Sequence, residues 1–208
     1  MADTPFGRSA GREEAPEMID PVRRVLGVVG ALGVALAPFR PDPALAREHR
    51  AWDFTFQSID GDPMPLAQWR GKVLLVVNTA SFCGFTNQYA ALQNLYARYR
   101  ERGLVVIGVP SNDFRQEKDS NEAVKRFCEV TFGVDFPLAA ISRVTGREAH
   151  PFYRWAAAAS SPPRWNFHKY LIDREGKLVG SWGASTRPDS AEVIRAIEAA
   201  LDRSAPAA

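Results

Sequence analysis

The sequence predicts an α/β fold in which a mixed central sheet is flanked by helices. Two continuous apolar runs, residues 73–77 and 104–109, are typical of strands that are covered on both faces. An amphipathic stretch, residues 87–100, separates them, so we expect parallel pairing through a right-handed helical crossover. A hairpin pattern over residues 167–182 follows near the carboxyl end. It would complete a mixed sheet with helices on both sides.

The first half of this domain is expected to contain one further strand and one helix besides the buried runs. Residues 52–56 alternate apolar and polar side chains before the turn at residues 60–62, which predicts a strand. Residues 87–100 place apolar side chains at steps of three and four, and Gly103 ends this helix. The apolar positions of the helix are Ala91, Leu92, Leu95, Tyr96 and Tyr99.

The second half is expected to contain three more helices. Asp119 and Glu122 are placed to cap a helix that runs to about Glu129. Residues 150–159 predict the next helix, which the Ser-Ser-Pro-Pro segment at 160–163 ends. The last helix starts near Asp189 or Ser190 and buries its apolar side chains, Val193, Ile194, Ile197 and Leu201. The order strand, helix, strand, helix, hairpin, helix is that of a thioredoxin-like fold.

Composition narrows the range of functions. The chain has 208 residues, which suits one catalytic domain, and its 26 Lys+Arg balance 24 Asp+Glu without any basic run. We therefore expect no nucleic-acid partner. The histidines His49, His150 and His168 and the cysteines Cys83 and Cys128 lack metal-site spacing, so neither a metal nor a cofactor is expected. Two cysteines leave open a structural disulfide, a redox pair or two unrelated buried thiols.

Residues 1–46 differ from the domain that we assign to residues 47–208. Arg23 and Arg24 precede an uncharged apolar run at 25–37, and the Ala-Leu-Ala segment at 44–46 suits a signal peptidase. This pattern predicts an export signal, and hence the bacterial periplasm. The run is shorter than the roughly 20 residues of a membrane span, so no stable span is expected.

Two alternatives to this leader remain open. Met18 is a possible true start, and the apolar run could instead be a buried helix of the domain, although three prolines separate it from the rest of the chain. Without a functional signal the protein would be cytoplasmic.

Cys83 is the candidate nucleophile. It follows the strand at 73–77 and precedes the helix, at the sheet edge where open α/β folds bind ligands. The N–H groups of a helix start favour a thiolate, which can attack a peroxide and become a sulfenic acid that a second thiol converts to a disulfide. The alternative is an inert buried cysteine. Thr86 occupies the place where a thioredoxin-type disulfide exchanger, or a copper chaperone, would need a second cysteine.

Three segments resemble the motifs of the glutathione peroxidase family. They are NTASFCGFT at 78–86, VPSNDF at 109–114 followed by QE at 116–117, and RWNF at 164–167 followed by KYLI at 169–172. The resemblance extends over about residues 52–201, and cysteine stands where the animal enzymes carry selenocysteine. It implies a thioredoxin-like fold, a peroxidase, and a site in which Gln116, Trp165 and Asn166 surround Cys83.

The resemblance gives these side chains a physical role. Amide and indole N–H groups aimed at the sulfur would stabilise the thiolate and the leaving oxygen. Trp165 as a core aromatic and Asn166 as a turn residue are the alternatives. The loop before Gln116 is one residue shorter than is usual in the family, so we expect it to follow a different path.

Cys128 lies in the segment FCEVTFGVDFP at 127–137, which resembles the resolving-cysteine segment of the thioredoxin-dependent branch of the family. The resemblance implies a disulfide with Cys83, whose closure would require local unwinding of the helix. A half-buried helix residue and a permanent bond to Cys83 are the alternatives.

The expected function is reduction of hydrogen peroxide and of organic or lipid hydroperoxides. A thioredoxin-like dithiol protein or glutathione would be the reductant, and the absence of an arginine pocket favours the dithiol protein. The segment between residues 151 and 165 lacks a long insertion, which favours a monomer with an open site. The alternatives are a peroxide sensor that passes a disulfide to a partner, and an exported binding domain with one structural disulfide.

Overall fold

The computed structural model describes residues 49–203, and the expected leader at 1–46 lies outside this range. The central sheet has four strands in the order β4-β3-β5-β6. Their bounds are Val73–Thr79 for β3, Leu104–Pro110 for β4, Lys169–Ile172 for β5 and Leu178–Trp182 for β6. β3 and β4 are parallel, whereas β5 is antiparallel to both β3 and β6. The predicted mixed sheet and thioredoxin-like α/β fold are confirmed.

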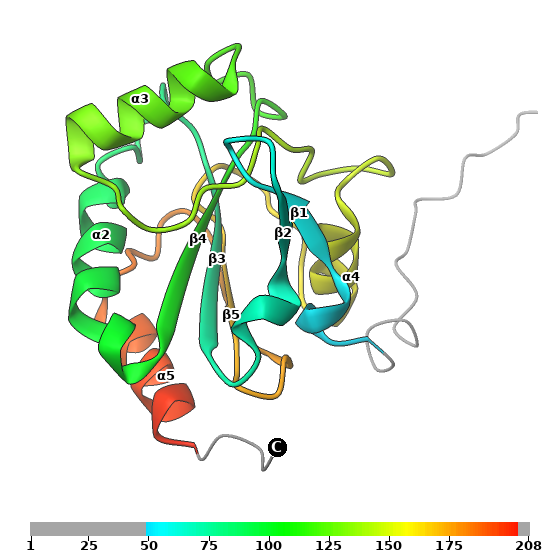
Figure 1. Ribbon diagram of the computed structural model, residues 1–208, viewed down its shortest axis with the longest axis vertical. Helices are drawn as coiled ribbons and strands as arrows, with labels where there is room; N and C mark the ends of the chain where they lie inside the picture. Colours follow the sequence, from blue (N-terminus) through cyan, green and yellow to red (C-terminus); the bar gives the residue numbers. More distant parts are fainter. Residues whose placement is uncertain (1–48, 204–208) are drawn as a thin grey trace, which may run out of the picture. The chain divides into compact units, whose positions relative to one another are not determined.

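Helices cover both faces of this sheet (Figure 1). The α-helices are α2, Gln88–Tyr99; α3, Asn121–Phe132; α4, Pro151–Ala159; and α5, Ala191–Asp202. Shorter elements complete the domain: β1, Thr55–Gln57; β2, Pro63–Pro65; and the 3₁₀ turns η1, Ala51–Asp53, η2, Leu66–Trp69, and η3, Arg100–Arg102. In Figure 1, α2 and α5 lie on one side of the sheet, and α4 lies with the β1–β2 hairpin on the other.

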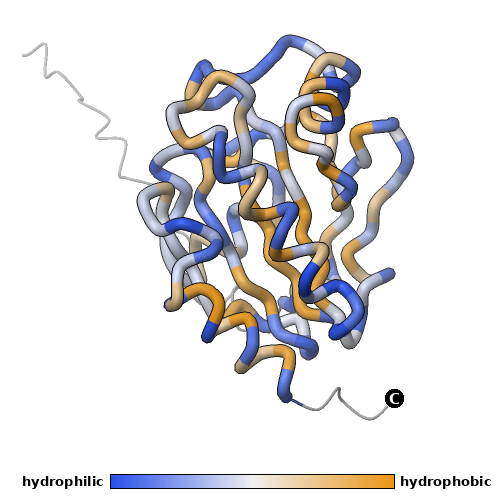
Figure 2. Tube along the Cα trace, turned by 90° about the vertical axis from the view of Figure 1, so that its left-hand side faces the viewer, coloured by the Kyte–Doolittle hydropathy of each residue, from blue (hydrophilic) through white to orange (hydrophobic). Residues whose placement is uncertain are grey.

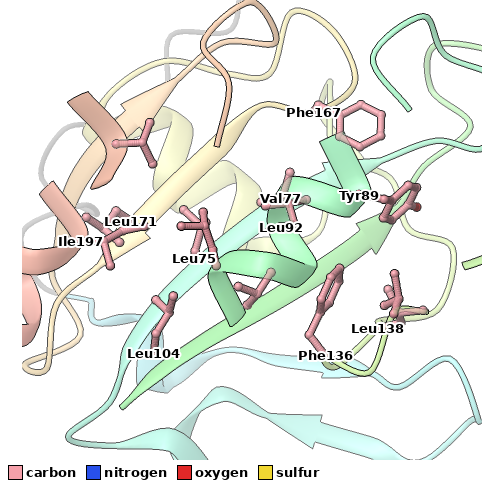
Figure 3. Close-up of a cluster of buried hydrophobic side chains, with 14 of the residues drawn as sticks. Leu75, Val77, Tyr89, Leu92, Leu104, Phe136, Leu138, Phe167, Leu171 and Ile197 are labelled. Atoms are coloured by element: carbon pink, nitrogen blue, oxygen red, sulfur yellow. The ribbon is translucent and has the colours of Figure 1, made fainter. Parts of the chain in front are cut away.

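The alternation of side chains along β3 explains this layering. Val73, Leu75 and Val77 belong to the apolar cluster that contains α2 and α5, whereas Leu74 and Val76 belong to the cluster that contains α4. Figure 3 shows Leu75 and Val77 beside the α2 side chains in the first cluster. Along the chain, apolar colour runs along the central strands, and apolar and polar colours alternate along the helices (Figure 2). A strand with two buried faces needs the continuous apolar run that predicted it.

Side-chain hydrogen bonds decide where the elements begin. Ser120 begins α3 by accepting the Ala123 N–H at 3.2 Å, and Ser190 begins α5 by accepting the Val193 N–H at 3.4 Å. Ser190 was one of the two expected starts of the last helix, but the cap of α3 is Ser120 rather than the expected Asp119.

The strand expected at residues 52–56 is wrong in its first half. The Asp53 carboxylate accepts the Arg50 N–H at 2.9 Å, which closes the 3₁₀ turn η1 and delays the strand to Thr55. Among residues 49–203, no helix combines the length and apolar character that crossing a bilayer requires.

Candidate active site

Cys83 lies in a tight turn between β3 and α2. The Phe85 N–H points at the Cys83 Sγ at 3.4 Å. The Thr86 hydroxyl accepts the Cys83 N–H at 3.1 Å, and the Thr86 N–H donates to the Cys83 carbonyl at 3.0 Å. The sequence predicted that the N–H groups of the helix start would face the sulfur. Because α2 begins only at Gln88, a turn N–H does so instead.

This turn places the sulfur inward and its neighbours outward. Cys83 is 8% exposed, whereas Phe82 and Phe85 are 63% and 37% exposed. The sequence analysis interpreted Thr86 only as the residue that stands where a disulfide exchanger would have its second cysteine. In the structure its hydroxyl braces the turn that orients Cys83.

Asn78 attaches the third motif to the end of β3. Its Nδ2 donates to the Trp165 carbonyl at 3.2 Å, and its Oδ1 accepts the His168 N–H at 3.0 Å. Its own carbonyl accepts the Phe167 N–H at 2.6 Å, and Phe167 adopts a left-handed φ of 63°. This role of Asn78 was not predicted from the sequence. The available signal was an amide that follows directly on an apolar strand.

Gln116 and Asn166 meet beside the Cys83 turn. Asn166 Nδ2 donates to Gln116 Oε1 at 3.0 Å, and the Gln116 carbonyl accepts the Phe82 N–H at 2.9 Å. Asn166 is fully buried. Arg115, in the shortened loop before Gln116, takes a left-handed φ of 57°. The bond to Asn166 leaves the NH₂ end of the Gln116 amide free to donate.

Trp165 is the most exposed of the three residues predicted to surround Cys83. Its side chain is 41% exposed and packs on Phe114, with 5.4 Å between ring centroids. Among the described residues, Phe85 alone donates a hydrogen bond to Cys83 Sγ, and the side chains of Gln116, Trp165 and Asn166 do not bond to it. The structure therefore brings the Gln116–Asn166 pair to the Cys83 turn, through the bond between the Gln116 carbonyl and the Phe82 N–H.

Glu117 fastens the second motif to the same turn, a role that was likewise not predicted from the sequence. Its Oε1 accepts the N–H groups of Ser81 at 3.0 Å and Lys118 at 2.8 Å. The side chain is 5% exposed, and this burial raises the pKa of its carboxyl group. The only sequence signal was its place directly after Gln116.

Cys128 lies on α3 in the same apolar cluster as Cys83. It is fully buried, and burial raises the pKa of its thiol to about 11; the nearby Tyr89 hydroxyl opposes this rise, while the Glu117 and Glu129 carboxylates add to it. Both cysteines are free thiols. Cys128 is thus held protonated in the folded protein.

Cavity size does not identify this site. A cavity of about 530 Å³, larger than the one that Trp165 borders, lies between the β1–β2 hairpin and the segments around α3, and none of the candidate residues lines it. Trp165 instead borders a cavity of about 250 Å³, together with Arg164 and His168. His168 is buried, and this burial, aided by the charge of Lys169, lowers the pKa of its imidazole to about 4.

Comparison with known proteins places these features in a family. The family model described as glutathione peroxidase matches residues 51–157, which include Cys83, Gln116 and Cys128. The hydroperoxy fatty acid reductase gpx1 of Synechocystis is 43% identical over 162 residues, covering 72% of this chain and 95% of that protein. The glutathione peroxidase-like peroxiredoxin gpx1 of Schizosaccharomyces pombe is 37% identical, covering 68% and 93%.

A solved structure agrees with these sequence matches. The crystal structure of Trgpx in apo form is 34% identical to this chain and superposes with a TM-score of 0.62, covering 76% of this chain and 99% of that one.

Proposed function

Because the chain belongs to the glutathione peroxidase family, and is therefore a peroxidase, we propose that Cys83 reduces hydrogen peroxide and organic or lipid hydroperoxides. The observation that carries this proposal is the Cys83 turn, in which a backbone N–H faces the sulfur and the Gln116–Asn166 pair lies alongside. A donor aimed at sulfur favours the thiolate, which is the form that attacks peroxides.

In the first step, the Cys83 thiolate attacks one peroxide oxygen and the O–O bond breaks. The sulfur is oxidised to a sulfenic acid, and the departing oxygen takes up a proton and leaves as water or an alcohol. The free NH₂ group of Gln116 and the indole N–H of Trp165 are the donors that would stabilise the negative charge on the departing oxygen.

In the second step, Cys128 resolves the sulfenic acid. Its thiol loses a proton, attacks the Cys83 sulfur and displaces hydroxide, which leaves as water while the S–S bond forms. A fully buried thiol with a pKa raised to about 11 cannot do this in place. We propose that α3 unwinds locally, which brings Cys128 to solvent and to Cys83.

In the third step, a thioredoxin-like dithiol protein reduces the disulfide, with glutathione as the other candidate. The name of the fission-yeast relative, a peroxiredoxin, supports a protein dithiol. The enzyme would act as a monomer. The sequence pattern of the leader favours export to the periplasm, where the donor would be a thioredoxin-like protein of that compartment.

Turnover tests the proposal. With hydroperoxide in excess and a thioredoxin, thioredoxin reductase and NADPH system, steady NADPH consumption is expected, and Cys83→Ser should abolish it. Consumption of one equivalent followed by a stable mixed disulfide with a partner would instead support the sensor that relays a disulfide. No reaction of the reduced protein with peroxide would support the binding domain.

A further inference from the structure

Helix α3, which carries Cys128, is attached to the rest of the domain by few buried side chains. Of its twelve residues, only Val124 and Cys128 are buried. Val130, on the same helix, is 79% exposed. A segment with so few buried apolar contacts opens at a lower free-energy cost than the central strands do. Each contact that α3 makes at its surface therefore has a large share in keeping Cys128 enclosed.

The Lys118 side chain makes such a contact. Its ammonium nitrogen lies 4.5 Å from the centroid of the Phe82 ring and 5.2 Å from the centroid of the Phe127 ring. Phe82 directly precedes Cys83, and Phe127 directly precedes Cys128. Both distances are within the roughly 6 Å over which cation–π attraction acts. One cation thus contacts a ring of the Cys83 turn and a ring of the helix that carries the other thiol.

The backbone of Lys118 is itself fixed to the Cys83 turn. Its N–H donates to Glu117 Oε1 at 2.8 Å, and the same oxygen accepts the Ser81 N–H at 3.0 Å. Among residues 49–203, no carboxylate forms an ion pair with the Lys118 ammonium group. The side chain therefore extends from a segment that is bonded to the Cys83 turn, and its charge interacts with the two rings.

The Phe127 ring connects this contact to the enclosure of Cys128. It packs edge-on against Phe132 and against Tyr89 of α2, with 5.7 and 6.5 Å between ring centroids. Because Phe127 is the neighbour of Cys128 in the helix, local unwinding that exposes the thiol also displaces this ring. Opening of α3 must therefore break the contact between the ring and Lys118.

We propose that Lys118 is a positioning residue that holds α3 in its folded position and so sets how long the Cys83 sulfenic acid persists before the disulfide forms. The inference rests on the proposed peroxidase steps and adds a control on the second of them. While the sulfenic acid persists, a second hydroperoxide can oxidise it to a sulfinic acid, and that hydroperoxide is itself reduced to water or an alcohol. A more firmly held α3 thus gives more of this over-oxidised product per turnover.

Alkylation of Cys128 tests the role of Lys118 without any peroxide. In a Cys83→Ser background, iodoacetamide should label Cys128 about fivefold faster in Lys118→Met, which keeps an unbranched apolar chain and removes the ammonium group. Lys118→Arg, which keeps a cation beside the rings, should restore the original rate. Lys177→Met is the matched control, because its ammonium group pairs with Glu175 in the turn between β5 and β6. Loss of a positive charge alone would raise the pKa of the thiol and slow its labelling, so faster labelling reports opening.

A double-variant comparison tests whether the Phe127 ring is the partner of the cation. Phe127→Leu should also speed the labelling, and adding Lys118→Met to it should have no further effect, because the contact is already lost. If labelling in Lys118→Met is unchanged or slower, or if the effects of the two substitutions multiply, the proposal is overturned.

Peroxide assays distinguish this inference from the peroxidase function. With both cysteines present, Lys118→Met should form the Cys83–Cys128 disulfide about fivefold faster and accumulate about fivefold less sulfinic acid per turnover, measured by mass spectrometry. If no hydroperoxide is consumed while labelling still responds to Lys118, the peroxidase proposal fails and the role of Lys118 stands. If hydroperoxide is consumed but neither the labelling nor the sulfinic acid changes, the role of Lys118 is wrong and the peroxidase function stands.

Discussion

The two cysteines share one apolar cluster but lie in opposite surroundings. Cys83 sits in a turn at the sheet edge, is 8% exposed and accepts a backbone N–H, whereas Cys128 sits inside α3 with no exposure and a pKa raised to about 11. The difference lies in the backbone: a turn can aim an N–H at a sulfur, while a helix interior uses its N–H groups internally. This contrast supports our proposal that Cys83 reacts in the folded protein and that Cys128 reacts only after its helix opens.

The largest effect is expected from exchanging the two thiols for hydroxyls one at a time. Cys83→Ser should lower peroxidase activity by about 10³-fold or more, because it removes the nucleophile. Cys128→Ser should still consume one equivalent of peroxide rapidly and then stop turning over with a dithiol protein. Stopped-flow and steady-state assays measure the two phases. If both variants lost the rapid consumption of one equivalent of peroxide to the same extent, Cys83 would not be the only thiol that reacts with peroxide, and the two proposed roles would be wrong.

The donors that we propose for the departing oxygen provide the next test. Trp165→Phe keeps an aromatic ring against Phe114 but removes the indole N–H, so the rate constant for Cys83 oxidation should fall by about 10²-fold. Trp182→Phe is the matched control, because its indole N–H bonds to Glu192 instead, and it should leave the rate unchanged. An unchanged rate in Trp165→Phe removes Trp165 from the set of donors.

The buried His168, which bonds to Asn78 near the Cys83 turn, should make the folded protein less stable in acid. His168, whose N–H holds Asn78, has its imidazole pKa lowered from 6.5 to about 4 by burial. Between these pH values the unfolded chain binds a proton that the folded one does not, so stability falls as the pH drops from 6.5 to 4, by about 3 kcal/mol. His168→Gln should lose less over this window in urea unfolding. Parallel wild-type and variant curves would contradict the burial of a neutral imidazole.

A smaller effect tests the opening of α3. Ser120→Ala removes the cap of this helix, which costs about 1 kcal/mol, and should speed formation of the Cys83–Cys128 disulfide about fivefold. Ser190→Ala removes the corresponding cap of α5 and should leave that rate unchanged. Rapid acid quench followed by thiol labelling measures disulfide formation. A slower closure in Ser120→Ala would mean that Cys128 reacts from the intact helix.

The sequence predicted the periodic parts of the fold well. Continuous apolar runs located β3 and β4, and the three- and four-residue spacing located α2 and α5. The first strand was misplaced because one Asp53 side chain closes a turn, which no apolar pattern records. The position between a buried strand and a helix supplied Cys83, and motif resemblance supplied Gln116, Trp165 and Asn166; the structure adds the contact between Gln116 and Asn166.

Other parts of the site could not be predicted because they depend on contacts between distant segments. Asn78 bonds to a backbone 87 residues away, and Glu117 to one 36 residues away. The spacing of apolar residues predicts which side of one helix or strand is buried. It does not predict hydrogen bonds between residues that are far apart in the sequence. The complete burial of Cys128 similarly depends on how α3 packs against α2 and the sheet.

Mass spectrometry after one equivalent of hydrogen peroxide tests the central contrast between the thiols most directly. The wild type should show a Cys83–Cys128 disulfide, and Cys128→Ser should show a sulfenic acid on Cys83, trapped with dimedone. An unmodified Cys83 in that variant, or oxidation that starts at Cys128, would contradict the assignment of Cys83 as the thiol that meets the peroxide.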